Sequence, residues 1–269
     1  MRCLYRERRY VCGDYLEVNI FPVYRVAGAR RRKAKPTSEV QARLNEINAE
    51  QRLIRILHAN FTKHDIELHL TYRDENLPET REQAMKDAQN FMRRVKRARA
   101  KLGLPELKYV IVAEGGINGT RFHFHVTMSG GMDRSEIERL WGYGYANTKQ
   151  LQFTENGIEG LARYITKQFR AHKDELPFRK RWTGSRNLII PEPQDRDGRL
   201  SQKKVKELAT IEGESREPFE KLYEGYYLAE CKPFYNEVNG GYYLHIKLYR
   251  HDAEFLNTRK RRRKNTECP

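Results

Sequence analysis

Alternating and helical patterns of apolar residues follow one another through the central part of the chain. Residues 65–73 alternate strictly between apolar and polar side chains, which predicts a half-buried strand. Over residues 84–98 the apolar side chains recur at helical spacing instead. Two more runs, 107–114 and 120–128, flank a glycine-rich turn and indicate a hairpin.

Similar patterns continue on both sides of this region. They predict a helix over 38–57, a helix ending at Trp141 with Asp133 and Glu136 as its capping pair, a strand over 146–153 and a helix over 157–171. The resulting order, β-α-β-β-α-β-α, is typical of the α+β class. We therefore expect a central, largely antiparallel β-sheet with helices packed on one face.

The weaker patterns at the two ends divide the chain into three parts. Residues 1–59 form a basic N-terminal extension with an amphipathic helix, and residues 60–190 form the predicted catalytic domain. Residues 191–269 form a C-terminal region with an aromatic hairpin around Asn239 and a basic tail. We interpret the first segment, before the basic linker at 30–35, as a docking segment.

The charge of the chain points to a polyanionic partner. Among 269 residues, 52 are Lys or Arg and 36 are Asp or Glu, a formal charge of +16, and nucleic acid is the leading candidate. The exposed side of the helix over 84–98 is strongly basic, with Arg99 counted among its exposed cations. The candidate DNA contacts are Arg93, Arg94, Lys96, Arg97 and Arg121.

Other partner classes and compartments receive no support from the sequence. No apolar run approaches the roughly 18 residues that span a bilayer, and the N-terminus lacks the apolar stretch of a signal peptide. The four cysteines include no C-x-x-C pair, which suits neither a disulfide framework nor a zinc finger. We expect a soluble cytoplasmic protein without a membrane partner.

Two histidines share the polar face of the strand over 120–128. His123 and His125 stand two positions apart, so both imidazoles can chelate one divalent ion. Glu114, on the preceding strand of the hairpin, is the obvious carboxylate to complete a three-ligand site. A His-x-His pattern alone is more often a pair of solvated strand residues, and Glu114 shifts that balance only modestly. We leave His69 out of the metal set, as a residue of the sheet surface.

The helix over 157–171 adds a second chemical group. Tyr164 lies at the edge of its apolar stripe, and Lys167 lies one turn further on. A phenol beside an ammonium group, held over a metal ion, provides the nucleophile, the Lewis acid and the cation for attack on a phosphodiester.

Three sequence blocks resemble the motifs of the His-hydrophobic-His (HUH) endonucleases, particularly the rolling-circle replication initiators of bacterial plasmids, phages and integrative elements. These blocks are ELHLTYRDENLP (67–78), AEGGINGTRFHFHVTM (113–128) and ARYITK (162–167). The resemblance implies the palm-like fold of these enzymes, and a single catalytic tyrosine because the last block contains only one.

The same resemblance assigns roles to individual residues. It implies that Glu114, His123 and His125 bind Mg²⁺ or Mn²⁺. Tyr164 would attack single-stranded DNA at an origin to give a 5′-phosphotyrosine and a free 3′-OH, and Lys167 would assist. A helicase partner is expected from the resemblance, since the chain contains no helicase P-loop.

Two other functions compete with this interpretation. His69 with Thr71 and His125 with Thr127 repeat the His-apolar-Thr pattern of metal-independent two-histidine phosphodiesterases, in which the histidines act as general acid and base. A non-catalytic, basic nucleic-acid-binding protein would explain the charge alone.

Overall fold

The chain divides into two compact units, each described here by itself. The computed structural model describes residues 3–24, 38–115, 121–154, 157–158, 160–161, 182–211 and 215–253. The central unit comprises Asn60–Phe153 and Ile158–Ile189. The terminal unit combines both ends of the chain: Met1–Ala59, Thr154–Gly157 and Ile190–Pro269.

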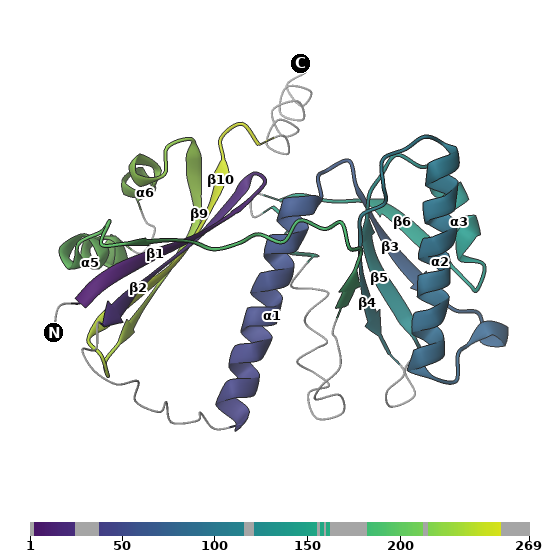
Figure 1. Cartoon of the computed structure of the whole chain (residues 1–269), viewed down its shortest axis with the longest axis horizontal. Helices are drawn as coiled ribbons and strands as arrows, with labels where there is room; N and C mark the ends of the chain where they lie inside the picture. The colour runs from purple at the N-terminus through teal and green to yellow at the C-terminus, as the bar shows by residue number, and fades with distance from the viewer. Residues whose placement is uncertain are drawn as a thin grey trace, which may run out of the picture. The chain divides into compact units, whose positions relative to one another are not determined.

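The central unit contains a five-stranded antiparallel sheet with the strand order β6-β3-β5-β4-β7 (Figure 1). Its strands are β3 (Ile66–Thr71), β4 (Tyr109–Glu114), β5 (His123–Met128), β6 (Ala146–Gln150) and β7 (Trp182–Gly184). The predicted hairpin is present as the β4–β5 pair. The predicted strand over 146–153 is shorter than expected, ending at Gln150.

Two helices cover the apolar face of this sheet (Figure 1). Helix α2 (Arg81–Lys101) begins after Thr80, whose side chain accepts a hydrogen bond from the Gln83 amide. Helix α3 (Arg134–Trp141) begins after Asp133, which accepts from the Glu136 amide as the capping pair predicts. A single 3₁₀ turn, η1 (Asp74–Asn76), follows β3.

The alternating pattern of β3 and β5 supplies most of the sheet side of this core. Their apolar residues pack against one stripe of α2 and against Trp141 of α3. Burial of such a face is the main driving force for this unit. The polar residues of the same strands consequently face the other side of the sheet.

The terminal unit contains a second antiparallel sheet that the sequence analysis did not predict. Its order is β8-β1-β2-β10-β9. The strands are β1 (Cys3–Cys12), β2 (Tyr15–Tyr24), β8 (Gln194–Asp197), β9 (Tyr226–Asn236) and β10 (Gly241–Arg250). The aromatic hairpin predicted around Asn239 is confirmed as the β9–β10 pair. The α+β class is confirmed, with two sheets in place of one.

Three helices belong to or border this second sheet. Helices α5 (Gln202–Ile211) and α6 (Glu217–Leu222) pack on its apolar face. Helix α1 (Ser38–Asn60) matches the predicted amphipathic helix. Its apolar stripe is buried only in the second half, because Leu44 and Ile47 are 47% and 44% exposed.

Several predictions fall on residues outside the described ranges. They are the basic linker at 30–35, the basic tail at 259–264 and most of the helix predicted over 157–171. Within the described residues, no helix combines the length and the apolar character needed to cross a membrane.

Candidate metal centre

His123 and His125 lie on the face of β5 that points away from α2 and α3. The intervening Phe124 is fully buried in the core, so alternation along the strand places both imidazoles on the opposite face. This is the arrangement that the sequence pattern predicts.

Glu114 is brought to the histidines by the register of the β4–β5 hairpin. It is the last residue of β4 and lies directly opposite His123. The chain turns immediately afterwards at Gly115, where φ is 81° and a Cβ atom would clash with the Arg121 carbonyl oxygen. Glycine therefore allows the two ends of the connection to approach closely.

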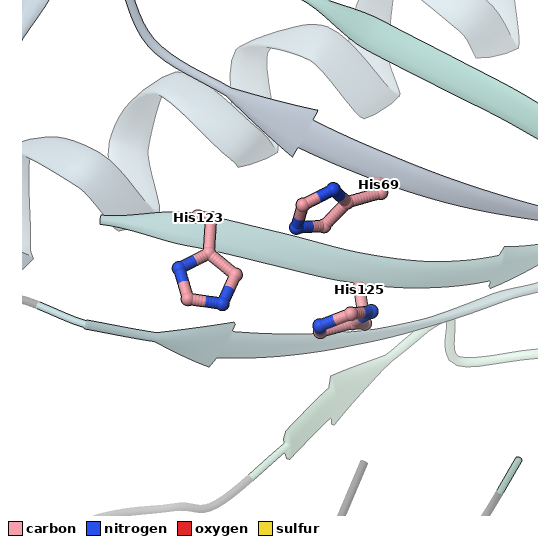
Figure 2. A group of neighbouring side chains, drawn as sticks. All are labelled: His69, His123 and His125. Carbon is pink, nitrogen blue, oxygen red and sulfur yellow. The ribbon is translucent and has the colours of Figure 1, made fainter. Parts of the chain in front are cut away.

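His69 joins this group from the neighbouring strand, contrary to its assignment as a simple surface residue. Strand β3 lies between β6 and β5, and His69 is directly opposite His125. The ligating nitrogens of His69, His123 and His125 all lie within 4.8 Å of one another. Figure 2 shows the three rings on the same side of the two adjacent strands.

The carboxylate of Glu114 interacts with two of the three imidazoles. Its Oε2 lies 3.0 Å from Nε2 of His123 and 3.6 Å from Nε2 of His125. The His69 ring stacks on that of His125, with centroids 4.9 Å apart and an interplanar angle of 25°. We call Glu114, His69, His123 and His125 the histidine cluster.

The other nitrogens of the two β5 histidines face further acceptors. Nδ1 of His123 lies 3.1 Å from the Arg121 carbonyl oxygen, a distance at which an N–H donates a hydrogen bond. Nδ1 of His125 lies 3.9 Å from Oε1 of Glu67. Metal-binding histidines commonly use such a second acceptor to fix the ring, so both rings have their Nε2 atoms available toward Glu114.

Burial and mutual charge shift the pKa values of the whole cluster. Burial raises the pKa of Glu114, but the hydrogen bonds with His123 and His125 outweigh it and lower the value to about 2. Burial lowers the pKa of His125, but Glu114 and Glu67 raise it to about 9. Glu114 also raises the pKa of His123, whereas burial and the other two histidines lower that of His69.

One atom of the cluster indicates that a cation is missing from the balance of partners. Glu114 is only 5% exposed, and its buried Oε1 has no hydrogen-bond partner among the described residues. A buried carboxylate oxygen without a partner is costly in a folded protein. Three imidazoles and one carboxylate around it form a donor set that fits a divalent metal ion.

The predicted nucleophile and its companion cannot be placed. Tyr164 and Lys167 both lie outside the described residues. Their position relative to the histidine cluster therefore stays a prediction.

The predicted DNA contacts on α2 are on the opposite side of the sheet from the cluster, since α2 packs on the apolar face. Arg94 donates to the carbonyl oxygens of Leu140 and Trp141 at 2.8 and 2.9 Å, and Lys96 pairs with an exposed Glu106. Arg93 donates to Asn90 and Arg97 bonds within its own helix.

Two further arginines differ from what the sequence suggested. Arg99 was expected on the exposed basic face, but it is 3% exposed and donates to the carbonyl oxygens of Pro105, Ser129 and Gly130. Arg121, at the start of β5, pairs with the exposed Asp74. Of the five candidate DNA contacts, Arg121 is the one beside the histidine cluster.

Comparison with known proteins agrees with the position of this cluster in the chain. Searches among curated proteins and among solved structures each returned no match. Residues 66–169 match a family of replication-associated proteins, described by its member ORF2. The matched segment contains the whole histidine cluster together with Tyr164 and Lys167, and it supports a replication initiator of the Rep type.

Proposed function

We propose that this protein nicks and rejoins single-stranded DNA at an origin as a rolling-circle replication initiator. The observation that carries the proposal is the gathering of Glu114, His123 and His125 on one face of a sheet, within the segment similar to replication-associated proteins. The polar face of β5, with its buried carboxylate, supports a site for the phosphate that is cleaved.

The chemistry requires one activated phosphodiester and one nucleophile. Glu114, His123 and His125 hold a divalent ion, Mg²⁺ or Mn²⁺, which acts as a Lewis acid on the scissile phosphoryl group. The Tyr164 oxygen, once deprotonated, forms a bond to phosphorus as the bond from phosphorus to O3′ breaks. The products are a 5′-phosphotyrosine and a 3′-OH, whose oxygen takes up a proton.

The same residues serve the reverse step. A 3′-OH attacks the phosphotyrosine, re-forms the phosphodiester and releases Tyr164, so the covalent intermediate conserves the bond energy. Lys167, one helical turn from Tyr164, stabilises negative charge during both steps. A helicase supplied by the host or by the element would separate the strands.

A direct test uses labelled single-stranded fragments tiled across the DNA element that encodes the protein. Incubation with Mn²⁺ and denaturing electrophoresis should show a covalent adduct that maps to Tyr164. The adduct should vanish with Tyr164→Phe and with EDTA, and it should persist with Tyr235→Phe, a matched change at an exposed tyrosine. An adduct at another residue would refute the assignment.

The register of β3 and β5 favours one rival specifically. His69 and His125, the two histidines of a metal-independent phosphodiesterase, are cross-strand neighbours with stacked rings. That enzyme would hydrolyse its substrate in EDTA, and it would not need Tyr164. Robust EDTA-resistant turnover by Tyr164→Phe would favour this rival, and DNA binding without cleavage in any divalent metal would favour a pure binding protein.

A further inference from the structure

The feature that the proposed function leaves unused is the imidazole of His69. The metal set of the proposal contains two histidines and a carboxylate from the β4–β5 hairpin. His69 comes from β3, on the other side of β5, and its ring nitrogen lies within 4.8 Å of a ring nitrogen of each of the other two histidines (Figure 2). The site is therefore approached by ligands from three adjacent strands.

The spacing of these atoms suits a single ion. Nitrogen ligands about 2.1 Å from one metal ion lie roughly 3 to 4.2 Å from each other, depending on the coordination geometry. The separations in the histidine cluster reach this range after small rotations of the side chains. His69 is exposed, His123 half-buried and His125 buried, so the more open side of the group is the one at His69.

The third imidazole changes which metals the site prefers. Mg²⁺ takes oxygen ligands in a near-ideal octahedron and keeps several waters, whereas imidazole nitrogen favours transition-metal ions. With His69 included, the protein offers three nitrogen donors and one carboxylate. With it excluded, a water oxygen takes that position and the bias against Mg²⁺ weakens.

We propose that His69 is an additional metal ligand, and that its imidazole makes the site select a transition-metal dication such as Mn²⁺ over Mg²⁺. The inference rests on the metal site of the proposed function, but it does not depend on DNA cleavage. It also gives His69 a role that differs from the acid–base role in the rival phosphodiesterase.

Direct titration of the full chain with Mn²⁺ and with Mg²⁺ tests the inference, using calorimetry for both ions and the electron paramagnetic resonance signal of free Mn²⁺. The unaltered chain should bind Mn²⁺ at least about tenfold more tightly than Mg²⁺. His69→Ala should lose at least about tenfold in Mn²⁺ affinity and change Mg²⁺ affinity much less. His64→Ala, a matched change at another exposed histidine just before β3, should leave both affinities unchanged.

A second variant tests the same point in the opposite direction. His69→Glu replaces the nitrogen donor by oxygen, so the ratio of Mn²⁺ to Mg²⁺ affinity should fall while the site keeps four protein ligands. Equal Mn²⁺ affinities for the unaltered chain and His69→Ala would overturn the inference, as would a chain without preference between the ions. Selective Mn²⁺ binding without any DNA adduct would leave the inference standing and refute the nicking proposal.

Discussion

Each of the two sheets buries a carboxylate on the face opposite its main apolar core, but the two carboxylates have different surroundings. Glu17 of β2 is fully buried, and both of its oxygens accept hydrogen bonds, from Arg55 at 2.9 and 2.5 Å and from Asn19 at 2.9 Å. Glu114 of β4 is also buried, but its partners are histidines and one of its oxygens has no partner among the described residues.

This difference separates a structural ion pair from a binding site. The charge of Glu17 is balanced by a guanidinium that cannot lose its proton, so the group is complete without a ligand. The imidazoles around Glu114 can lose their protons and then offer nitrogen lone pairs to an ion. Buried charge that is fully satisfied indicates stability, and buried charge with an unused oxygen indicates a ligand.

The strongest test of this comparison removes the cation of the closed pair. Arg55→Met should lower the free energy of unfolding by about 3 to 5 kcal/mol, because it leaves the Glu17 carboxylate buried without its counter-ion. Urea denaturation at neutral pH measures the loss, and hydrogen exchange in β2 and β10 assigns it to the terminal unit. The double change Arg55→Met with Glu17→Leu should recover most of the stability.

The matched change in the open group should behave differently. Glu114→Gln should cost less stability than Arg55→Met, since the neighbouring histidines can become neutral, and it should abolish metal binding. If Glu114→Gln destabilised the protein as much as Arg55→Met and left metal affinity intact, the distinction between the two groups would be wrong.

A smaller effect is expected when acid titrates the charges of the terminal sheet. Burial raises the pKa of Glu230, but Lys232 and Lys247 outweigh it and lower the value to about 2. Because the folded pKa lies below the unfolded value of about 4.3, the stabilisation is complete above that pH. It is lost as the pH falls from about 4.3 through 2.

The expected loss is about 1 kcal/mol, reduced by the partial exposure of Glu230. Hydrogen exchange in β9 and β10 across this pH window measures it separately from Glu114, which titrates in the same range in the other unit. Glu230→Gln should flatten the pH dependence in these strands. An unchanged slope would show that the ion pairs of this sheet do not stabilise it.

The sequence predicts the part of the site that depends on neighbouring elements. Alternation along β5 and the short distance between Glu114 and His123 in the hairpin suffice to place three residues together. His69 was missed because its position depends on β3 pairing with β5 rather than β4, and α2 lies between these strands in the chain. Periodicity shows which face a residue occupies and leaves the order of the strands undetermined.

The terminal sheet shows the same limit more strongly. Strand β2 pairs with β10, more than 200 residues later, and no local pattern reports such a pairing. The turn at Gly13 between β1 and β2 was a usable signal, since a two-residue Gly-Asp connection is typical of hairpins. Helical spacing likewise placed Arg94 and Arg99 near the basic face, and only tertiary contacts reveal that their guanidinium groups hold backbone carbonyls.

The smallest effect concerns whether satisfied and less engaged arginines on α2 differ as the two carboxylates do. Arg93→Ala should change the free energy of unfolding by less than about 0.5 kcal/mol, because its side chain bonds only to Asn90 among the described contacts. If Arg93 contacts a phosphate, the log-log salt slope of single-strand binding should fall by about 0.7. Arg94→Ala should instead cost about 1 kcal/mol, by leaving the Leu140 and Trp141 carbonyls without a donor, and should keep the slope unchanged. Equal changes of slope in both variants would show that the bonds of Arg94 yield to DNA, and that satisfaction within the fold does not decide which charges bind.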